Sequence, residues 1–143
     1  MALMGDDIYE DEMYPAIERA FWGRYSRGSG QIKPYVWRPH RKTYEIPDFA
    51  YIRAYNQIHV VEAKRFAGDV WRALDQLRNY RGNYKYLALP NGEYNNDRES
   101  IDENIENLCG LILVFRRGRG LSAKFHADSP KYEGDYSKYY ANV

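Results

Sequence analysis

The chain has 143 residues, of which 44% are hydrophobic and 16% aromatic, and its formal net charge is +1. This length and composition predict one folded domain with a hydrophobic core. No apolar run is long enough to span a bilayer and the N-terminus lacks the pattern of a signal peptide, so we expect an intracellular, cytoplasmic protein with no membrane partner. The single cysteine, Cys109, excludes an internal disulfide and an iron–sulfur cluster, which needs about four ligands.

The first predicted element is a helix that has Pro15 in its first turn and runs to about residue 25, after an acidic stretch at residues 6–12. Glu18 lies beside the predicted buried stripe of this helix. One interpretation of Glu18 is a surface carboxylate exposed to solvent. The stripe is predicted from apolar residues at helical spacing, namely Met13, Ile17, Ala20 and Phe21.

The segment 23–44 is basic and contains no acidic residue. Cations neutralise phosphates and flat rings stack on unpaired bases, so we predict that this segment binds DNA. The alternative is a solvated edge hairpin whose charges deter aggregation. Within the segment, residues 27–30 predict a mobile loop and residues 31–37 a strand that Pro34 interrupts. The candidate DNA contacts are Arg24, Arg27, Lys33, Arg38, Arg41 and Lys42.

Two apolar runs of strand length follow, at residues 46–52 and 57–65, and together they predict a β-hairpin. Glu62 and Lys64 are two residues apart on the second strand, so their side chains point to the same face. With a three-residue connecting loop, Asp48 falls directly opposite Glu62, with Cβ atoms about 4.5 to 5.5 Å apart. A two-residue loop puts Asp48 on the other face.

Residues 69–81 predict a helix in which Gln76 and Tyr80, four apart, share a face. Residues 84–89 then predict a strand that is closed by a turn at residues 90–92. Another helix, marked by Ile101, Ile105 and Leu108, precedes an apolar strand at residues 111–115. Strand, helix and strand in this order fit a parallel crossover.

A second basic cluster follows the last predicted strand and is equally compatible with a grip on a phosphate backbone and with a solvated loop. It contains Arg116, Arg117 and Arg119. Residues 129–143 are rich in tyrosine and lack periodicity, which predicts a mobile tail or a strap across the surface. We therefore expect a single α/β domain at residues 1–128, with a central mixed β-sheet that starts with an antiparallel hairpin and has helices on both faces.

The order of Pro47-Asp48, a hairpin and Glu62-Ala63-Lys64 resembles the signature of the PD-(D/E)xK nuclease superfamily. The pair Gln76 and Tyr80 resembles the Q-x-x-x-Y motif of the branch that contains RecB and lambda exonuclease. A Glu-x-Lys triplet alone is common by chance, so the hairpin and the following helix carry most of the weight. The resemblance covers about residues 13–115 and implies a restriction-endonuclease-like core.

This resemblance implies a metal-dependent deoxyribonuclease that acts in DNA recombination and repair. Carboxylate and carbonyl oxygens are ligands that Mg²⁺ or Mn²⁺ accepts, and a neighbouring ammonium can hold a water or the scissile phosphate. In the resembled family a helical carboxylate often joins the metal site, and the glutamine–tyrosine pair positions the substrate. The implied ligands are Asp48, Glu62, Ala63 and Glu18, and the other implied site residues are Lys64, Gln76 and Tyr80.

Three interpretations remain open from the sequence. A nuclease is the first, either an exonuclease or end-processing enzyme, as Gln76 and Tyr80 favour, or a Holliday-junction-resolvase-like endonuclease, as the small size and Glu18 favour. A nucleic-acid-binding module that does not cut is the second, and an α/β domain with an accidental motif is the third. The sequence leaves open the form of the DNA and the oligomeric state. A homodimer is compatible with it.

Overall fold

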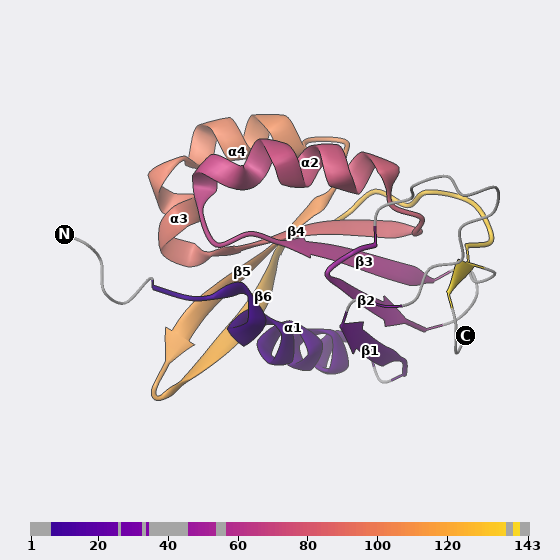
Figure 1. Cartoon of the computed structure of the whole chain (residues 1–143), viewed down its shortest axis with the longest axis horizontal. Coiled ribbons are helices and arrows are strands. Elements are labelled where there is room, and N and C mark those ends of the chain that lie inside the picture. Colours follow the sequence, from indigo (N-terminus) through magenta and orange to yellow (C-terminus); the bar gives the residue numbers. More distant parts are fainter. Residues whose placement is uncertain are drawn as a thin grey trace.

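A computed structural model describes residues 7–25, 27–32, 34, 46–53, 57–136 and 139–140. They form an α/β fold in which a curled, mixed sheet of six strands carries four α-helices (Figure 1). In chain order the elements are α1 (Glu10–Arg24), β1 (Ser29–Ile32), β2 (Phe49–Ile52), β3 (Ile58–Ala63), the 3₁₀ turn η3 (Ala67–Asp69), α2 (Val70–Asn79), β4 (Tyr84–Pro90), α3 (Asn91–Asn96), α4 (Arg98–Ile105), β5 (Gly110–Arg117) and β6 (Gly120–Ala127).

The strands lie in the sheet in their chain order, from β1 to β6. The pairs β1–β2, β2–β3 and β5–β6 are antiparallel, and β3–β4 and β4–β5 are parallel. Each parallel pair is joined by helical segments, as a crossover requires. The predicted mixed sheet that starts with an antiparallel hairpin is confirmed.

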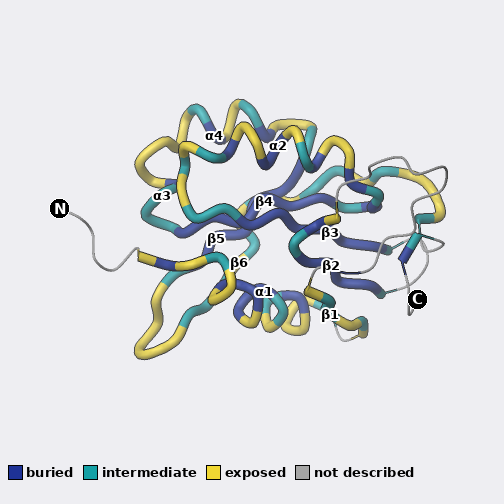
Figure 2. Tube along the Cα trace, in the orientation of Figure 1, coloured by how far each residue is buried: buried dark blue, intermediate teal, exposed yellow. Residues whose placement is uncertain are grey.

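The sheet has a hydrophobic core on each face. Helices α2, α3 and α4 cover one face and α1 covers the other, as the opposite sides of the sheet in Figure 1 show. Even-numbered residues of β3, such as Val60, pack against α2, and odd-numbered residues, such as Val61, pack against α1. This alternation follows from the two-residue period of a strand. Strands β2 and β3 are therefore buried along their whole length, as Figure 2 shows.

The register between β2 and β3 is the one that a three-residue loop predicts. Phe49 pairs with Val61, and the Arg53 backbone N–H donates to the Gln57 carbonyl at 3.2 Å. The loop residues themselves, 54–56, lie outside the described residues. Continuing the register by one residue places Asp48 opposite Glu62, as expected.

Three local predictions are wrong. Helix α1 begins at Glu10, well before Pro15, because the Glu12 carboxylate accepts the Tyr9 backbone N–H at 2.9 Å and caps the helix there. Strand β4 runs through Pro90 straight into α3, so residues 90–92 form no separate turn.

The third correction concerns residues 27–30, which were expected to form a mobile loop, and the residues after Gly120, for which no strand was predicted. Ser29 and Gly30 belong to β1, and the residues after Gly120 form β6. Both are edge strands, whose mixed polar composition hides them from a search for apolar runs. The predicted strand 31–37 is described only at residues 31, 32 and 34, and strand structure covers the first two.

Residues 129–136 and 139–140 lie across the sheet as a strap. Asn83 anchors it, because its buried side-chain amide donates to the Tyr132 and Gly134 carbonyls at 2.8 and 2.9 Å and accepts the Ile58 backbone N–H at 3.2 Å. The Tyr140 ring is buried in the core on the α2 face. The described part of the C-terminal segment is thus a strap. No helix in the described ranges has the length and apolar character needed to cross a membrane.

We predict that Asn83→Ala lowers the free energy of unfolding by about 2 kcal/mol or more, because it leaves buried backbone groups without hydrogen-bond partners. Chemical denaturation measures this loss, and limited proteolysis should cut sooner near Lys131. Asn79→Ala is the matched control, since the exposed Asn79 amide makes one hydrogen bond, to the Asp75 carbonyl at 3.1 Å. Equal destabilisation by the two substitutions would contradict the anchoring role.

Candidate active site at the ends of β2 and β3

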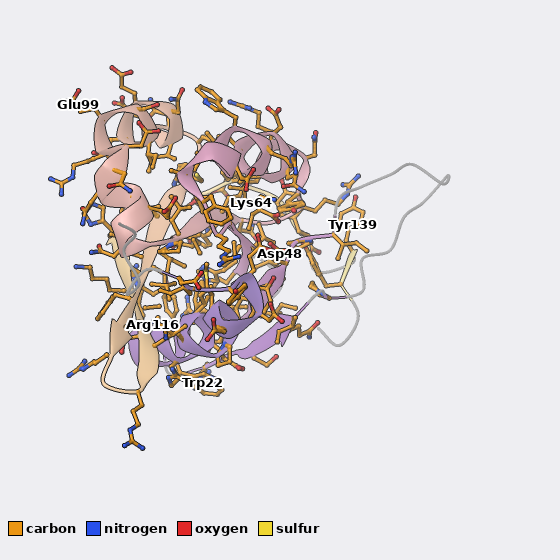
Figure 3. All side chains as sticks on the ribbon, turned by 60° about the vertical axis from the view of Figure 1, so that its left-hand side comes forward. Trp22, Asp48, Lys64, Glu99, Arg116 and Tyr139 are labelled. Atoms are coloured by element: carbon orange, nitrogen blue, oxygen red, sulfur yellow. The ribbon has the colours of Figure 1, made fainter. Side chains whose placement is uncertain are left out.

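Asp48, Glu62 and Lys64 come together where β2 begins and β3 ends. The Ala63 backbone N–H donates to Asp48 Oδ2 at 3.0 Å, which fixes the Asp48 carboxylate beside the end of β3. Lys64 Nζ lies 3.3 Å from Glu62 Oε2. Figure 3 shows Asp48 and Lys64 close to each other, with Trp22 and Glu99 at distant parts of the surface. The hairpin register therefore builds a cluster of two carboxylates and one ammonium.

Both oxygens of the Glu62 carboxylate have partners. Tyr80, which directly follows α2, donates its hydroxyl to Oε1, and Lys64 pairs with Oε2. Glu62 lies two residues after Val60 in β3, so its side chain points to the same face, which α2 covers. The residue is 2% exposed. The residues that follow the ends of β3 and α2 thus hold one carboxylate in a fixed position.

The environment of Glu62 favours its protonated form. Burial, with the nearby Asp48 carboxylate as the next cause, raises the pKa of Glu62 from 4.5 to about 7. The Tyr80 hydrogen bond and the Lys64 charge act in the opposite direction without cancelling the rise. A buried carboxylate beside a second, half-buried carboxylate is a place where a cation would be stabilised.

Helix α1 supplies two further side chains that the sequence did not identify. Burial, followed by the Asp48 charge, raises the pKa of Glu10, and the Lys64 charge lowers it. Burial and then the Asp48 charge likewise raise the pKa of Tyr14, on which Glu10 and Glu62 also act. Glu10 and Tyr14 are one turn apart on α1 and so share a face. The acidic stretch was interpreted as preceding the helix, and only the earlier start of α1 brings Glu10 to the site.

Glu18 lies elsewhere. Its Oε2 atom is adjacent to Gly30 in β1, and its charge acts on Tyr51. Eight residues separate Glu18 from Glu10, which is about 12 Å along a helix. Of these two carboxylates on α1, Glu10 is the one on which the charges of Asp48 and Lys64 act.

The two residues of the predicted pair, Gln76 and Tyr80, differ in their contacts. Tyr80 contacts Glu62, whereas the buried Oε1 atom of Gln76 has no hydrogen-bond partner. A buried acceptor without a partner costs free energy and marks a position where a ligand or water can bind. Gln76 stays a candidate for contact with a ligand.

The donor set fits a small divalent cation. Because the Lys64 backbone N–H bonds to Ala88 of β4 at 3.0 Å, the neighbouring Ala63 peptide groups face the opposite side, where Asp48 lies. Asp48, Glu62 and the Ala63 carbonyl are then oxygen ligands of the kind that Mg²⁺ or Mn²⁺ prefers, with waters completing the shell. Within the described ranges, no three histidine, cysteine or acidic side chains converge closely enough to hold an ion.

The predicted DNA-contact residues are dispersed. Arg24 pairs with Asp128 at 2.6 Å, so it already has a protein partner. Arg27 is exposed before β1, and Arg116 donates to the Asp7 carbonyl at 2.8 Å. Arg117 and Arg119 are exposed at the tip of the β5–β6 hairpin, while Lys33, Arg38, Arg41 and Lys42 lie outside the described residues.

Comparison with known proteins adds information on the fold. No family model matches the chain, and no curated protein matches it. A solved structure of a protein of unknown function from Silicibacter pomeroyi is similar, with a TM-score of 0.51 and 15% sequence identity, over 93% of this chain and 77% of that chain. At this identity the likeness shows a common fold alone.

The raised pKa of Glu62 predicts how pH affects stability without metal. Its contribution is fully present below about pH 4.5 and is lost as the pH rises through about 7, because the buried carboxylate must then ionise. The change amounts to at most about 3 kcal/mol. We expect Glu62→Gln to become more stable than wild type as the pH rises from about 5 to about 8.

Denaturation with a chelator present measures this difference as a function of pH. Glu99→Gln is the control, because Glu99 is exposed and far from the site (Figure 3). A pH dependence of Glu62→Gln that is identical to that of wild type would contradict the raised pKa.

Proposed function

We propose that the protein is a metal-dependent nuclease that hydrolyses phosphodiester bonds of DNA, on a restriction-endonuclease-like core. One observation carries the proposal: the β2–β3 register brings Asp48 and Glu62 to one point, with Lys64 3.3 Å from Glu62. These are the residues through which the sequence resembles the PD-(D/E)xK superfamily. An accidental motif would have no reason to converge in space.

Each side chain of the site has a separate role in the proposed hydrolysis. Asp48, Glu62 and the Ala63 carbonyl would hold Mg²⁺ or Mn²⁺, which neutralises charge on the phosphodiester and promotes ionisation of a water molecule. Lys64 lies beside this position and can orient the water or the scissile phosphate through its ammonium group. Tyr80 holds the Glu62 carboxylate in one orientation by its hydrogen bond.

Burial of the site contributes to its chemistry. Glu62 is almost inaccessible to solvent, and Lys64 is 12% exposed at its side chain. In such a position each charge acts more strongly than in water. The preorganised ammonium therefore stabilises developing negative charge at little reorganisation cost.

The second candidate is a DNA-binding module on the same fold that does not cut. It is favoured by the finding that, of the side chains described, no three acidic, histidine or cysteine residues form a ligand group. The two candidates predict the same binding surface and differ only in turnover. A cleavage assay therefore separates them.

We predict that Glu62→Ala and Lys64→Ala each lower the cleavage rate by about 100-fold or more, while DNA affinity in the presence of chelator stays within about 3-fold. The losses should be non-additive in the double variant, since both residues serve one reaction centre. Rates are measured on single-stranded, duplex and four-way-junction DNA with Mg²⁺ or Mn²⁺.

Lys131→Ala is the matched control, because Lys131 is exposed in the strap and its loss removes the same charge. If wild type cuts none of these substrates, or if Glu62→Ala cuts as fast as wild type, the binding module replaces the nuclease.

Tyr80→Phe tests the hydrogen bond to Glu62. Because the Tyr80 hydroxyl lowers the pKa of Glu62, its loss should raise that pKa and move the pH at which metal-dependent activity is half-maximal to a higher value. Tyr94→Phe is the control, since the Tyr94 hydroxyl bonds to Asp102 and His126, outside the site. A pH profile of Tyr80→Phe identical to that of wild type would show that the contact does not tune Glu62.

A further inference from the structure

Next to the candidate site lies a surface that the proposed chemistry does not use. The segment after β3 continues from Lys64 through Arg65 and Phe66 into η3. Lys64 and Asp69, at its two ends, both act electrostatically on Glu10. Arg65, within this segment, pairs with Asp7 and lies over the Tyr9 ring, so the segment faces the start of α1.

Two aromatic rings are exposed on this surface. Phe66 is 49% exposed and Tyr9 is 50% exposed. The Arg65 guanidinium lies between them, with its Cζ atom 3.8 Å from the centre of the Tyr9 ring and 4.8 Å from that of Phe66. Single exposed apolar residues are ordinary, but here two exposed rings contact one guanidinium beside the candidate active site, so the three side chains form one group. We call Tyr9, Arg65 and Phe66 the aromatic platform.

Two cationic side chains lie near the platform, and the acidic residues Glu10 to Glu12 follow Tyr9 in the first turn of α1. Lys64 adjoins it along the chain, and Arg116 reaches the same place by donating to the Asp7 carbonyl. The Asp7 carboxylate pairs with Arg65, and its side chain is 56% exposed. An anion already occupies the position in front of Arg65, so a phosphate can exchange with this carboxylate. The charges fit a nucleic acid strand, and the rings fit its bases.

We propose that the aromatic platform binds unpaired nucleotides, so that the substrate class of the site is single-stranded DNA or a frayed end. The proposal rests on the proposed function for the identity of the substrate. Base faces inside a duplex are covered by neighbouring base pairs, so an aromatic side chain stacks readily only on an unpaired base. The phosphate that follows such a base is then presented to Lys64.

Phe66→Leu tests the platform, because it keeps apolar volume and removes the ring. Affinity is measured by fluorescence anisotropy with labelled single-stranded and blunt duplex oligonucleotides of one sequence, in chelator so that nothing is cut. We expect about 5-fold or greater weakening for the single strand and less than about 2-fold for the duplex. Phe66→Trp should restore single-strand binding, since it restores a ring.

Trp22→Leu is the matched control, because Trp22 is also 49% exposed but lies on α1 away from Lys64 (Figure 3). A second variant, Tyr9→Leu, should repeat the strand-selective loss, and its backbone contacts at the start of α1 do not depend on the side chain. Thermal unfolding checks that each variant is folded. Equal losses for single strand and duplex, or no loss in either Phe66→Leu or Tyr9→Leu, would overturn the platform.

The outcome is separable from that of the proposed function. Single-strand binding that depends on Phe66, without any Mg²⁺- or Mn²⁺-dependent cleavage by wild type, supports the platform and overturns the nuclease. Cleavage by wild type together with unchanged binding by Phe66→Leu overturns the platform and leaves the nuclease. Absence of any DNA binding by wild type overturns both.

Discussion

The pairing register of β2 with β3 is the constraint on which the candidate site depends. Strand side chains alternate between faces, so a shift of one residue would send Asp48 to the α1 face while Glu62 and Lys64 stayed on the α2 face. The register is held by the buried side chains on both faces of the two strands, and by the hydrogen bond from Ala63 to Asp48. The same interactions that bury the hairpin therefore position the acidic pair.

The site combines stable elements with an unfavourable electrostatic arrangement. Glu62 sits at the end of a fully buried strand, close to Asp48, and its pKa is raised because the charged form is poorly solvated there. Lys64 and Tyr80 offset part of this cost. Such an arrangement is typical of sites that bind a cation or work on a charged substrate, where the ligand supplies the missing stabilisation.

The proposed function concerns the reaction at the candidate site, and the aromatic platform concerns the form of the DNA that reaches this site. In the proposal, the acidic pair and Lys64 act at a phosphodiester, and they do not determine whether a single strand or a duplex presents it. Tyr9, Arg65 and Phe66 bear on that choice through the shape and exposure of their rings. Arg117 and Arg119 are exposed at the tip of the β5–β6 hairpin, and their contact with a phosphate backbone stays a prediction.

The sequence by itself determined the α/β class, the hairpin and the common face of Glu62 and Lys64, because each follows from local periodicity and short-range turn geometry. The placement of Glu10 and Tyr14 was decided only by the tertiary structure, since it depends on the capped start of α1 and on how that helix crosses the sheet. Strand β6 was not predicted, and the sequence left the C-terminal segment open between a mobile tail and a strap, because an edge strand and a tail depend on contacts with residues far away in the chain. The periodicity of the sequence indicates which face of its own strand or helix a residue occupies. The packing of the elements decides which residues of other elements lie opposite it.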